Sequence, residues 1–480
     1  MGRVFETHRC RSVGLEDSTH PTGQRSEMHL VFAGEWNPMR YVLDALYLLI
    51  LLFSSPWLLY KSITTGKYRR GLWAKFTGRA FLRSGYAPCV WFHGVSVGEI
   101  HLLRQLVARF RQRHPEWQCV LSATTDTGFE EATKRFADLP VFYWPLDFSW
   151  AVRRALRRVR PILVVLAEGE LWPNFLLAAK AKNIPVAVVN GRLSPRSARR
   201  YQRLRWLVRP LFARLELIAA QTPEYAASYR MLGANRVQVT GSIKFDGVEG
   251  NRDNPRTQEL RRLLAIDRDD LVWIAGSTQA PEEQIALDIY KRLMPEHPLL
   301  RLILVPRQRE RFDEVAAMLR HSGLSWVRRS ELTTQHSAFS IQHLALSTHH
   351  SPPVILVDTI GELGALWGLA DVAFVGGSLD GKRGGQNMIE PAAYGAAVVF
   401  GPHVWNFKEI AARLVEAGAA IQVADETSLE ETVRELLRDA TERERLGVAA
   451  RRFVFQQQGA TERTIDLLGD LIEVRAAHAA

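Results

Sequence analysis

The sequence has few cysteines, no dinucleotide-binding glycine motif and no internal repeat of fixed period. Its three cysteines, Cys10, Cys89 and Cys119, lack metal-ligand spacing, and an odd number makes a poor disulfide framework. The absence of a G-x-G-x-x-G motif weakens the case for a dinucleotide-binding domain. The chain therefore fits a reducing compartment, and we expect neither a metal ion nor a cofactor.

Two adjacent histidines, His349 and His350, could suggest a metal site. No cysteine or carboxylate stands at ligand spacing from them, which favours a solvated loop. The stretch around them, residues 331–353, is polar and is expected to be a surface excursion.

Long apolar runs are also scarce, and one stands near the N-terminus, from Tyr41 to Tyr60. As a helix it would extend roughly 30 Å, enough to cross the hydrocarbon core of a bilayer. Basic residues between Lys61 and Arg70 follow it instead of a cleavage site, which predicts a retained single-pass anchor with the later domains in the cytoplasm. A helix lying on the membrane is the alternative. We expect the anchor, residues 41–60, to contribute nothing to either core, and residues 1–40 to be a disordered polar extension.

Charge and length suggest a two-domain protein with anionic partners. The 480 residues exceed what one hydrophobic core usually supports, and the formal net charge is +11. Arginines crowd two segments, Arg153–Arg160 and Arg199–Arg209. A merely solvated basic face would explain them too. Beside a membrane anchor we expect them to face an anionic membrane surface or a phosphorylated lipid, and we expect no nucleic acid.

Short β-branched runs alternate with amphipathic helical stretches in both halves of the chain. This alternation is typical of parallel sheets with helical crossovers. The expected strands are 89–95, 119–123, 141–144, 162–166, 186–189, 215–220 and 237–240 in the first half, and 271–275, 302–305, 354–357, 372–375, 398–400 and 420–423 in the second.

The pattern breaks once, at FDGVEGNRDNPR (residues 245–256), which reads as an interdomain linker. We therefore expect an N-terminal Rossmann-like domain over 61–244 and a C-terminal one over 257–455. Residues 456–480 should form a C-terminal helix. We therefore expect a cleft between the two α/β sheets.

In the first half the residue placed for chemistry is Glu99. A strand ending at Val95 leads into Ser96-Val97-Gly98-Glu99, with a helix beginning at or just after the Glu. Ligands of parallel α/β sheets bind beyond the carboxyl ends of strands, so Glu99 stands where a site is expected. A carboxylate stabilising a helix N-terminus is the structural alternative.

In the second half, four successive strand ends bear residues suited to a nucleotide. The turn after residues 271–275 could hold an anion through free N–H groups, and an Arg after the next strand suits a phosphate. The candidates are Gly276, Ser277 and Thr278; Pro306 and Arg307; Thr359, Ile360 and Gly361; and Asn387, Met388, Ile389 and Glu390. Together they predict a nucleotide pocket in the C-terminal domain.

Several motifs, in register along the chain after Arg40, resemble those of one family, the 3-deoxy-D-manno-octulosonic acid (Kdo) transferases. They are HGVSVGE (93–99), GELWPN (169–174), NGRLSPRS (190–197), TGSIKFD (240–246), AGST (275–278), VPR (305–307), VDTIGELG (357–364), and VGGSL with GGQNMIEPAAYG (375–395).

The resemblance implies a GT-B fold and an inverting, metal-independent transfer of Kdo from CMP-Kdo to a lipid A precursor (lipid IVA). It implies lipopolysaccharide core synthesis at the cytoplasmic face of the inner membrane. By carry-over Glu99 is the general base, and Pro306–Arg307, Thr359–Gly361 and Asn387–Glu390 look like the CMP-binding segments.

This chain departs from the family pattern at two positions. Gln279 and Gln386 stand where the family usually has His, and glutamine cannot carry a positive charge near neutral pH. Two alternatives therefore stay open. One is another GT-B enzyme, a UDP-sugar transferase or a nucleotide-sugar epimerase. The other is a membrane-tethered binding protein with impaired catalysis.

Overall fold

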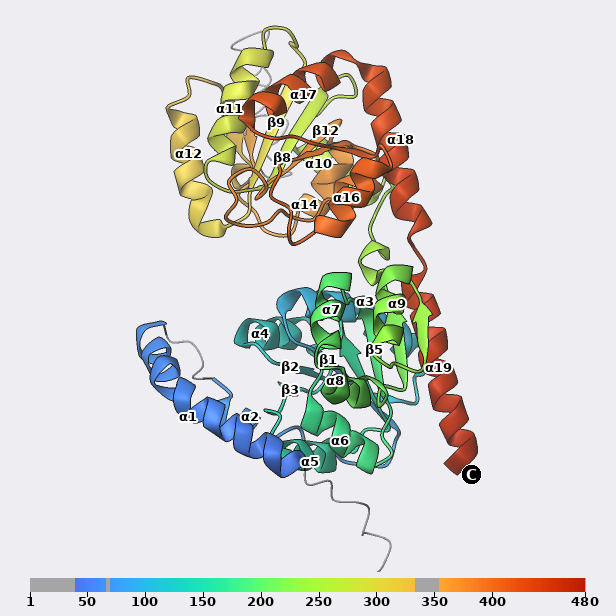
Figure 1. Ribbon diagram of the computed structural model, residues 1–480. Helices are drawn as coiled ribbons and strands as arrows, with labels where there is room; N and C mark the ends of the chain where they lie inside the picture. Colours follow the sequence, from blue (N-terminus) through green and yellow to red (C-terminus); the bar gives the residue numbers. More distant parts are fainter. Residues whose placement is uncertain (1–38, 66–69, 333–353, 480) are drawn as a thin grey trace, which may run out of the picture.

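The computed structural model describes residues 39–65, 70–332 and 354–479, which form two α/β domains and flanking helices (Figure 1). The first sheet contains β1 (Cys89–Gly94), β2 (Gln118–Ala123), β3 (Val141–Tyr143), β4 (Leu163–Ala167), β5 (Val186–Gly191), β6 (Leu217–Ala220) and β7 (Val237–Val239). The second contains β8 (Leu271–Thr278), β9 (Leu300–Pro306), β10 (Trp326–Arg328), β11 (Val354–Leu356), β12 (Val372–Val375), β13 (Ala397–Phe400) and β14 (Ala420–Gln422).

Both sheets are parallel throughout the described residues. The order is β3-β2-β1-β4-β5-β6-β7 in the N-terminal sheet and β10-β11-β9-β8-β12-β13-β14 in the C-terminal sheet. The doubly wound pair of sheets expected from the alternating pattern is confirmed.

Helices connect the strands and flank the two sheets. Those of the N-terminal half are α1 (Met39–Thr65), α2 (Leu72–Thr77), α3 (Val97–Arg113), α4 (Asp126–Arg135), α5 (Ser149–Val159), α6 (Pro173–Ala181), α7 (Pro195–Gln202), α8 (Arg205–Phe212), α9 (Pro223–Met231) and η1 (Ile243–Phe245). Those of the C-terminal half are α10 (Pro255–Leu263), α11 (Glu282–Leu293), η2 (Arg309–Arg311), α12 (Phe312–Arg320), η3 (Arg329–Glu331), α14 (Leu363–Leu366), η4 (Trp367–Leu369), α15 (Ile389–Ala393), α16 (Lys408–Glu416), α17 (Glu426–Arg438), α18 (Ala440–Gln456) and α19 (Ala460–Ala479).

The strand side chains alternate between two hydrophobic layers, as period-two geometry requires. Along β1, Cys89 and Trp91 join the core shared with α5 and α6, whereas Val90 and Phe92 join the core shared with α3 and α19. All four side chains are fully buried. A parallel sheet covered on both faces has this near-continuous apolar sequence, which is why the strands could be located in advance.

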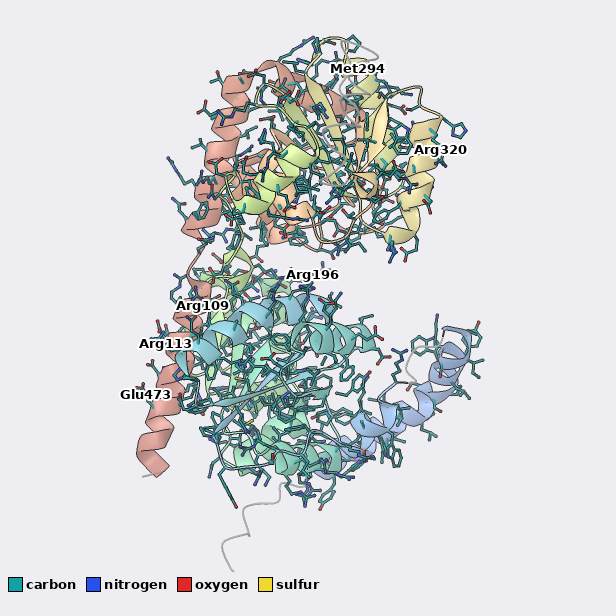
Figure 2. All side chains as sticks on the ribbon, turned by 180° about the vertical axis from the view of Figure 1, so that it is seen from behind. Arg109, Arg113, Arg196, Met294, Arg320 and Glu473 are labelled. Carbon is teal, nitrogen blue, oxygen red and sulfur yellow. The ribbon has the colours of Figure 1, made fainter. Side chains whose placement is uncertain are left out.

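The chain passes between the domains twice, and both passages are held by polar contacts. In the predicted linker, the Arg252 guanidinium donates to the carbonyls of Tyr394 and Ala370 at 2.9 and 2.7 Å. Asp246 accepts from the backbone N–H of Gly459 at 2.7 Å, where the chain returns. Helix α19 then packs on the N-terminal domain, with Arg113 bonded to Asp466 at 2.5 Å (Figure 2). The predicted boundaries of the domains themselves stay a prediction.

Three local differences from the sequence expectations stand out. Strand β10 was missed, because its three residues Trp326–Arg328 offer no apolar run. Helix α3 begins at Val97 rather than at Glu99. The polar stretch with His349 and His350 lies largely outside the described residues.

The apolar run forms α1, and its segment Met39–Trp57 is long and apolar enough to cross a membrane by length and composition. Its start is docked on the N-terminal domain, however. Asp44 is buried, and its carboxylate accepts from the Ser149 N–H at 2.8 Å, the Ser149 hydroxyl at 2.6 Å and the Asn174 amide at 3.0 Å. No residue of α1 belongs to the hydrophobic core clusters of the described residues, but these buried polar contacts attach the helix to the N-terminal domain, which the sequence did not predict.

Candidate active site

Glu99 lies in the first turn of α3, directly beyond the carboxyl end of β1. Its Oε2 accepts from the Val95 N–H at 2.8 Å and its Oε1 from the Ser96 hydroxyl at 3.0 Å. These bonds are the helix-start contacts that the structural alternative predicts. They occupy two of about four lone-pair positions on the carboxylate, so the group keeps capacity to accept a proton.

The surroundings of Glu99 tune its acidity. Burial raises the pKa of the Glu99 carboxyl to about 7; the Val95 N–H opposes this rise, and the negative charges of Glu168 and Glu170 add to it. A base whose pKa lies near the working pH is partly ionised and still basic enough to take a proton. Glu99 thus has the property that general-base catalysis requires.

Three polar residues beside this site were missed by the sequence reasoning. Glu168 follows β4 in the left-handed region, with φ of 57°, an unusual conformation for a residue other than glycine. Its Oε1 lies 3.1 Å from Lys244 Nζ and accepts from the Asn190 amide at 3.2 Å. Asn190 and Lys244 belong to two of the strand-end motifs, and Glu168 immediately precedes a third. The recurrence of polar residues at strand ends could have identified these three residues from the sequence.

In the C-terminal domain, Glu390 and Asn387 form one part of the candidate pocket. Asn387 Nδ2 donates to Glu390 Oε1 at 2.9 Å. Burial raises the pKa of Glu390, while that hydrogen bond and the positive charge of Arg307 oppose the rise. Glu390 Oε2 also lies 3.9 Å from where a Cβ of Gly364 would stand, so the segments around 360 and 390 are neighbours. Arg307 itself is exposed after β9.

The Thr359–Gly361 segment forms a loop beyond β11. The Thr359 hydroxyl donates to Glu362, which also accepts from Arg256 at 2.5 Å and Arg329 at 2.8 Å. Ile360 is 76% exposed and Gly361 has a φ of 94°. Glu362 therefore fixes a loop whose tip stays open to solvent.

Five other predicted residues lie deeper than expected. Met388 and Ile389 belong to the hydrophobic core, so their side chains face away from solvent. Gly276, Ser277 and Thr278 are buried because β8 continues to Thr278. The side chains of Met388, Ile389, Ser277 and Thr278 are therefore buried, and a contact of these residues with a ligand stays a prediction.

One N–H group next to that turn, that of Gln279, is already used by a carboxylate of the chain. Glu282 is 1% exposed and accepts four backbone hydrogen bonds, from Gln279 at 3.0 Å, Gly377 at 2.6 Å, Ser378 at 2.9 Å and Leu379 at 3.1 Å. The Glu282 carboxylate thus lies beside the expected anion-binding turn, whose role stays a prediction. Glu282 instead ties the paired-glycine loop after β12 to the start of α11.

The two glutamines that replace histidine flank this loop. Gln279 is buried, and its N–H is one of the four that Glu282 accepts. Gln386 Nε2 lies 3.2 Å from where a Cβ of Gly377 would stand. Both positions therefore touch the framework of the paired-glycine loop.

The carboxyl edges of the two sheets face each other. Tyr225, on α9 after β6, donates through its hydroxyl to Glu409, on α16 after β13. His101 of α3 lies close enough to Arg307 for that charge to help lower the imidazole pKa, which burial lowers first. Arg196 stands at the edge of the N-terminal domain nearest to the other domain (Figure 2). Glu99 and the candidate nucleotide residues thus belong to facing edges.

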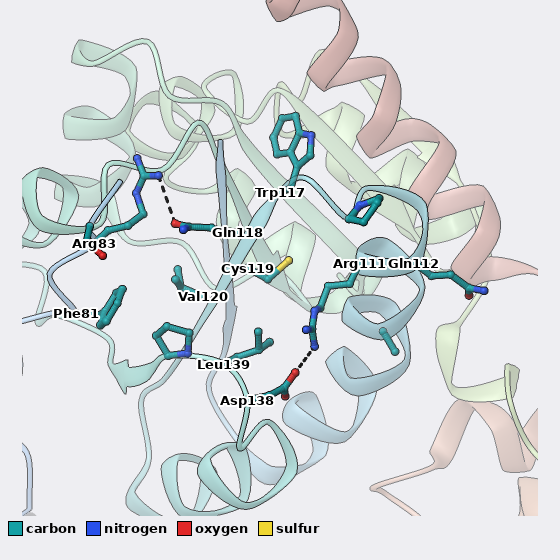
Figure 3. A pocket seen from close by; sticks show the side chains of 14 residues that line it. Phe81, Arg83, Arg111, Gln112, Trp117, Gln118, Cys119, Val120, Asp138 and Leu139 are labelled. Carbon is teal, nitrogen blue, oxygen red and sulfur yellow. Dashed lines mark hydrogen bonds and ion pairs between the residues drawn. The ribbon is translucent and has the colours of Figure 1, made fainter. Parts of the chain in front are cut away.

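Two of the cavities among the described residues lie elsewhere. One, of about 620 Å³, is lined by Arg83, Arg111 and Asp138 and by the start of β2, at the sheet edge opposite to Glu99 (Figure 3). Its polar groups already pair internally, with Arg111 bonded to Asp138 at 2.5 Å. The other, of about 670 Å³, lies beside the Tyr225–Glu409 contact between the domains. Neither includes a residue predicted for the site.

Among the described residues, no group of three His, Cys, Asp or Glu could hold a metal ion, and metal independence stays a prediction.

Comparison with known proteins gives consistent matches. The family model of 3-deoxy-D-manno-octulosonic-acid transferases (kdotransferases) matches residues 67–247. The 3-deoxy-D-manno-octulosonic acid transferase of Haemophilus influenzae is 34% identical over 440 residues, covering 89% of this chain and 98% of that protein. That of Bordetella pertussis is 35% identical over 416 residues, 83% of this chain and 92% of that protein.

A solved structure, a putative UDP-N-acetylglucosamine 2-epimerase from Listeria monocytogenes, superposes with a TM-score of 0.50. It is 12% identical, covering 81% of this chain and 97% of that one, and so shows the fold alone.

Two parallel α/β domains with facing strand-end loops define the GT-B fold. A carboxylate with a pKa near neutrality on one edge suits group transfer to a hydroxyl. Given the extent of the matches, the chain belongs to the 3-deoxy-D-manno-octulosonic acid (Kdo) transferases. It is therefore a glycosyltransferase.

Proposed function

We propose that this enzyme transfers Kdo from CMP-Kdo to a lipid A precursor, lipid IVA, with inversion and without a metal ion. The observation that carries the proposal is Glu99, a half-buried carboxylate with a pKa of about 7 at the edge that faces the candidate nucleotide residues. Family membership supplies the sugar. Membership of the Kdo transferase family also argues against the UDP-sugar transferase and epimerase alternatives.

In the proposed reaction, an acceptor hydroxyl gives its proton to the Glu99 carboxylate as its oxygen attacks the anomeric carbon of Kdo. The bond from that carbon to the phosphate oxygen of CMP-Kdo breaks, and CMP leaves with the electron pair. Glu99 must be deprotonated at the start of each cycle. Its hydrogen bonds from Val95 and Ser96 hold the carboxylate in place while the proton is transferred.

For the donor, we propose that Arg307 faces the phosphate and that Glu390 accepts from the ribose hydroxyls. Arg is suited to phosphate because its planar guanidinium offers several donors, and a carboxylate accepts from paired hydroxyls. The hydrogen bond from Asn387 orients Glu390 for this purpose. We propose the loop of Thr359, Ile360 and Gly361 as a third part of the donor site, and the backbone at 276–278 as a fourth.

For the acceptor, we propose that the protein works on the cytoplasmic side of the inner membrane, where a lipid acceptor with phosphate groups is embedded. Helix α1 exposes a long apolar surface, which is compatible with membrane association. On α7 and α8, five arginines are interleaved with exposed Tyr201 and Trp206. Such a surface suits anionic headgroups, and we propose no nucleic-acid partner.

The test is a transfer assay with purified protein, CMP-Kdo and a detergent-dispersed tetraacylated lipid A precursor, with products read by mass spectrometry. We expect the acceptor mass to rise by one or more Kdo residues, and no product with UDP-sugars. A protein that binds CMP-Kdo yet never forms product would instead support the impaired binding protein.

A further inference from the structure

We propose that α1 does not cross the bilayer but lies along its surface, with one apolar face in the lipid and both ends on the side of the catalytic domains. This placement rests on the membrane attachment proposed above and replaces the single-pass anchor expected from the sequence. The occupant of the exposed face of α1 is a phospholipid bilayer.

The first observation is that the start of α1 is fixed to the N-terminal domain. Besides the three bonds to Asp44, the Tyr47 hydroxyl donates to Asp147 Oδ2 at 3.0 Å, and its ring meets Phe148 edge-on. Asp147 in turn accepts from the first N–H groups of α6, those of Asn174 and Phe175, at 2.9 and 2.8 Å. These buried bonds tie two turns of α1 to α5 and α6.

The second observation is that the chain returns to the same domain soon after α1 ends. Arg70 pairs with Glu130 of α4, and Lys75 of α2 lies 3.6 Å from Asp126. Only five peptide steps separate Thr65 from Arg70, and they span at most about 18 Å when fully extended. Both ends of the helix are therefore held near one domain.

A crossing helix cannot satisfy both constraints. Its ends would stand on opposite sides of a hydrocarbon core about 30 Å thick. With Asp44 docked on one side, Thr65 would reach the other side, and Arg70 could not return to Glu130. The docked geometry therefore requires both ends of α1 on one side of the membrane.

The third observation is that α1 is two-faced. Its side chains that are not exposed fall on one stripe at helical spacing and are mostly polar: Arg40, Leu43, Asp44, Tyr47, Leu51, Ser54, Lys61 and Ser62. The opposite face is exposed and apolar, as Leu49, Phe53 and Tyr60 show, and Phe53 is 79% exposed. The charged members of the stripe stand near the two ends of α1, with Arg40 and Asp44 at its start and Lys61 at its end. A helix that lies in the membrane interface keeps such groups in the headgroup layer and its apolar face in the lipid.

Helix α2 extends the apolar surface beyond α1. Trp73 is 71% exposed and Leu72 is exposed beside it, while Phe76 of the same helix packs on Phe148 and Trp150. Exposed tryptophan is favoured at the boundary between lipid and water. Membrane contact on this side would hold the N-terminal domain against the leaflet that contains the acceptor.

The decisive experiment locates the two ends of α1. In a Cys10→Ser background, Met39→Cys and Thr64→Cys are expressed separately in a Gram-negative host and treated with a membrane-impermeant maleimide. The natural Cys89 and Cys119 are buried and should stay unlabelled. We expect both new cysteines to be protected in intact spheroplasts and labelled in inverted vesicles. Labelling of either one in spheroplasts, or recovery of the protein as a soluble species, would overturn the proposal.

A matched pair of charge substitutions gives a second readout. Phe53→Asp places a charge on the apolar face, and Ser54→Asp places one on the polar stripe one residue later. We expect the first to lower the membrane-bound to soluble ratio about tenfold or more and the second to leave it nearly unchanged. Equal effects would indicate a spanning helix, in which both charges would lie within the hydrocarbon core. The detergent assay separates the two proposals, since a wrong topology leaves transfer intact.

Discussion

Two glutamates occupy comparable places in the two domains and differ in what their carboxylates contact. Glu99 and Glu282 each lie in the first turn of the helix that follows a central strand, β1 and β8. Glu282 is fully buried and accepts four backbone N–H groups. Glu99 is half-buried and accepts one N–H and one hydroxyl. Burial raises the pKa of both carboxyls, so the pKa does not separate them. The comparison teaches that a carboxylate bonded by four buried N–H groups is a framework element, whereas one with two hydrogen bonds and partial exposure is able to react.

The largest expected effect separates the two glutamates by activity. Glu99→Gln should lower turnover by about 10²–10⁴-fold, the usual contribution of a general base. CMP affinity should be unchanged, because the donor residues lie in the other domain. Steady-state kinetics and CMP titration measure both.

Stability provides the control for this variant. The folded-state pKa of Glu99 is raised, so its ionised form costs stability above about pH 7. Glu99→Gln should therefore be as stable as the wild type, or more so, at pH 8. Near-normal turnover with both substrates would mean that Glu99 only supports the start of α3.

The next effect concerns Glu282. Glu282→Ala would leave four buried N–H groups unpaired, and each costs about 1–3 kcal/mol, so we expect a loss of stability on the order of 4 kcal/mol. Urea unfolding followed by fluorescence measures it, with Glu310→Ala on the exposed η2 turn as the matched control. If the two variants were equally stable, the framework role of Glu282 would be wrong.

A smaller effect is expected at the donor residues. Arg307→Ala or Glu390→Ala should weaken CMP binding by roughly 1–3 kcal/mol for each lost charge-assisted hydrogen bond. Isothermal titration with CMP and UMP measures this, and Arg320→Ala, on the outer side of α12, is the control (Figure 2). Unchanged affinity would remove these residues from the pocket. Equal or tighter binding of UMP would revive the UDP-sugar alternative.

The fold could be predicted from the sequence because most strands are apolar runs that can be recognised locally. Apolar runs such as Leu300–Pro306, buried on both faces, are recognisable without a structure. The three-residue β10 lacks such a run and was missed. The docking of Asp44 could not be predicted from the sequence, because its partners Ser149 and Asn174 lie 105 and 130 residues further along the chain.

The positions of the candidate site residues at strand ends could be predicted from the sequence. Which of their side-chain and backbone atoms can contact a ligand could not. Gly276 and Thr278 were assigned to an open turn, but both are buried in β8. Glu282 of the following helix bonds Gly377 and Ser378, 95 and 96 residues away, which the sequence could not show. Met388 and Ile389 were carried along with Asn387 and Glu390 as one motif. A motif does not show which of its side chains turn into the core.

The most direct test of Glu99 as the base is the pH dependence of kcat/KM. Because the base must be ionised and its pKa is about 7, log kcat/KM should rise with a slope of one up to an inflection near pH 7 and then level off. The residual activity of Glu99→Gln should lack this inflection. A wild-type profile that stays flat down to pH 5, or the same inflection in Glu99→Gln, would contradict the account.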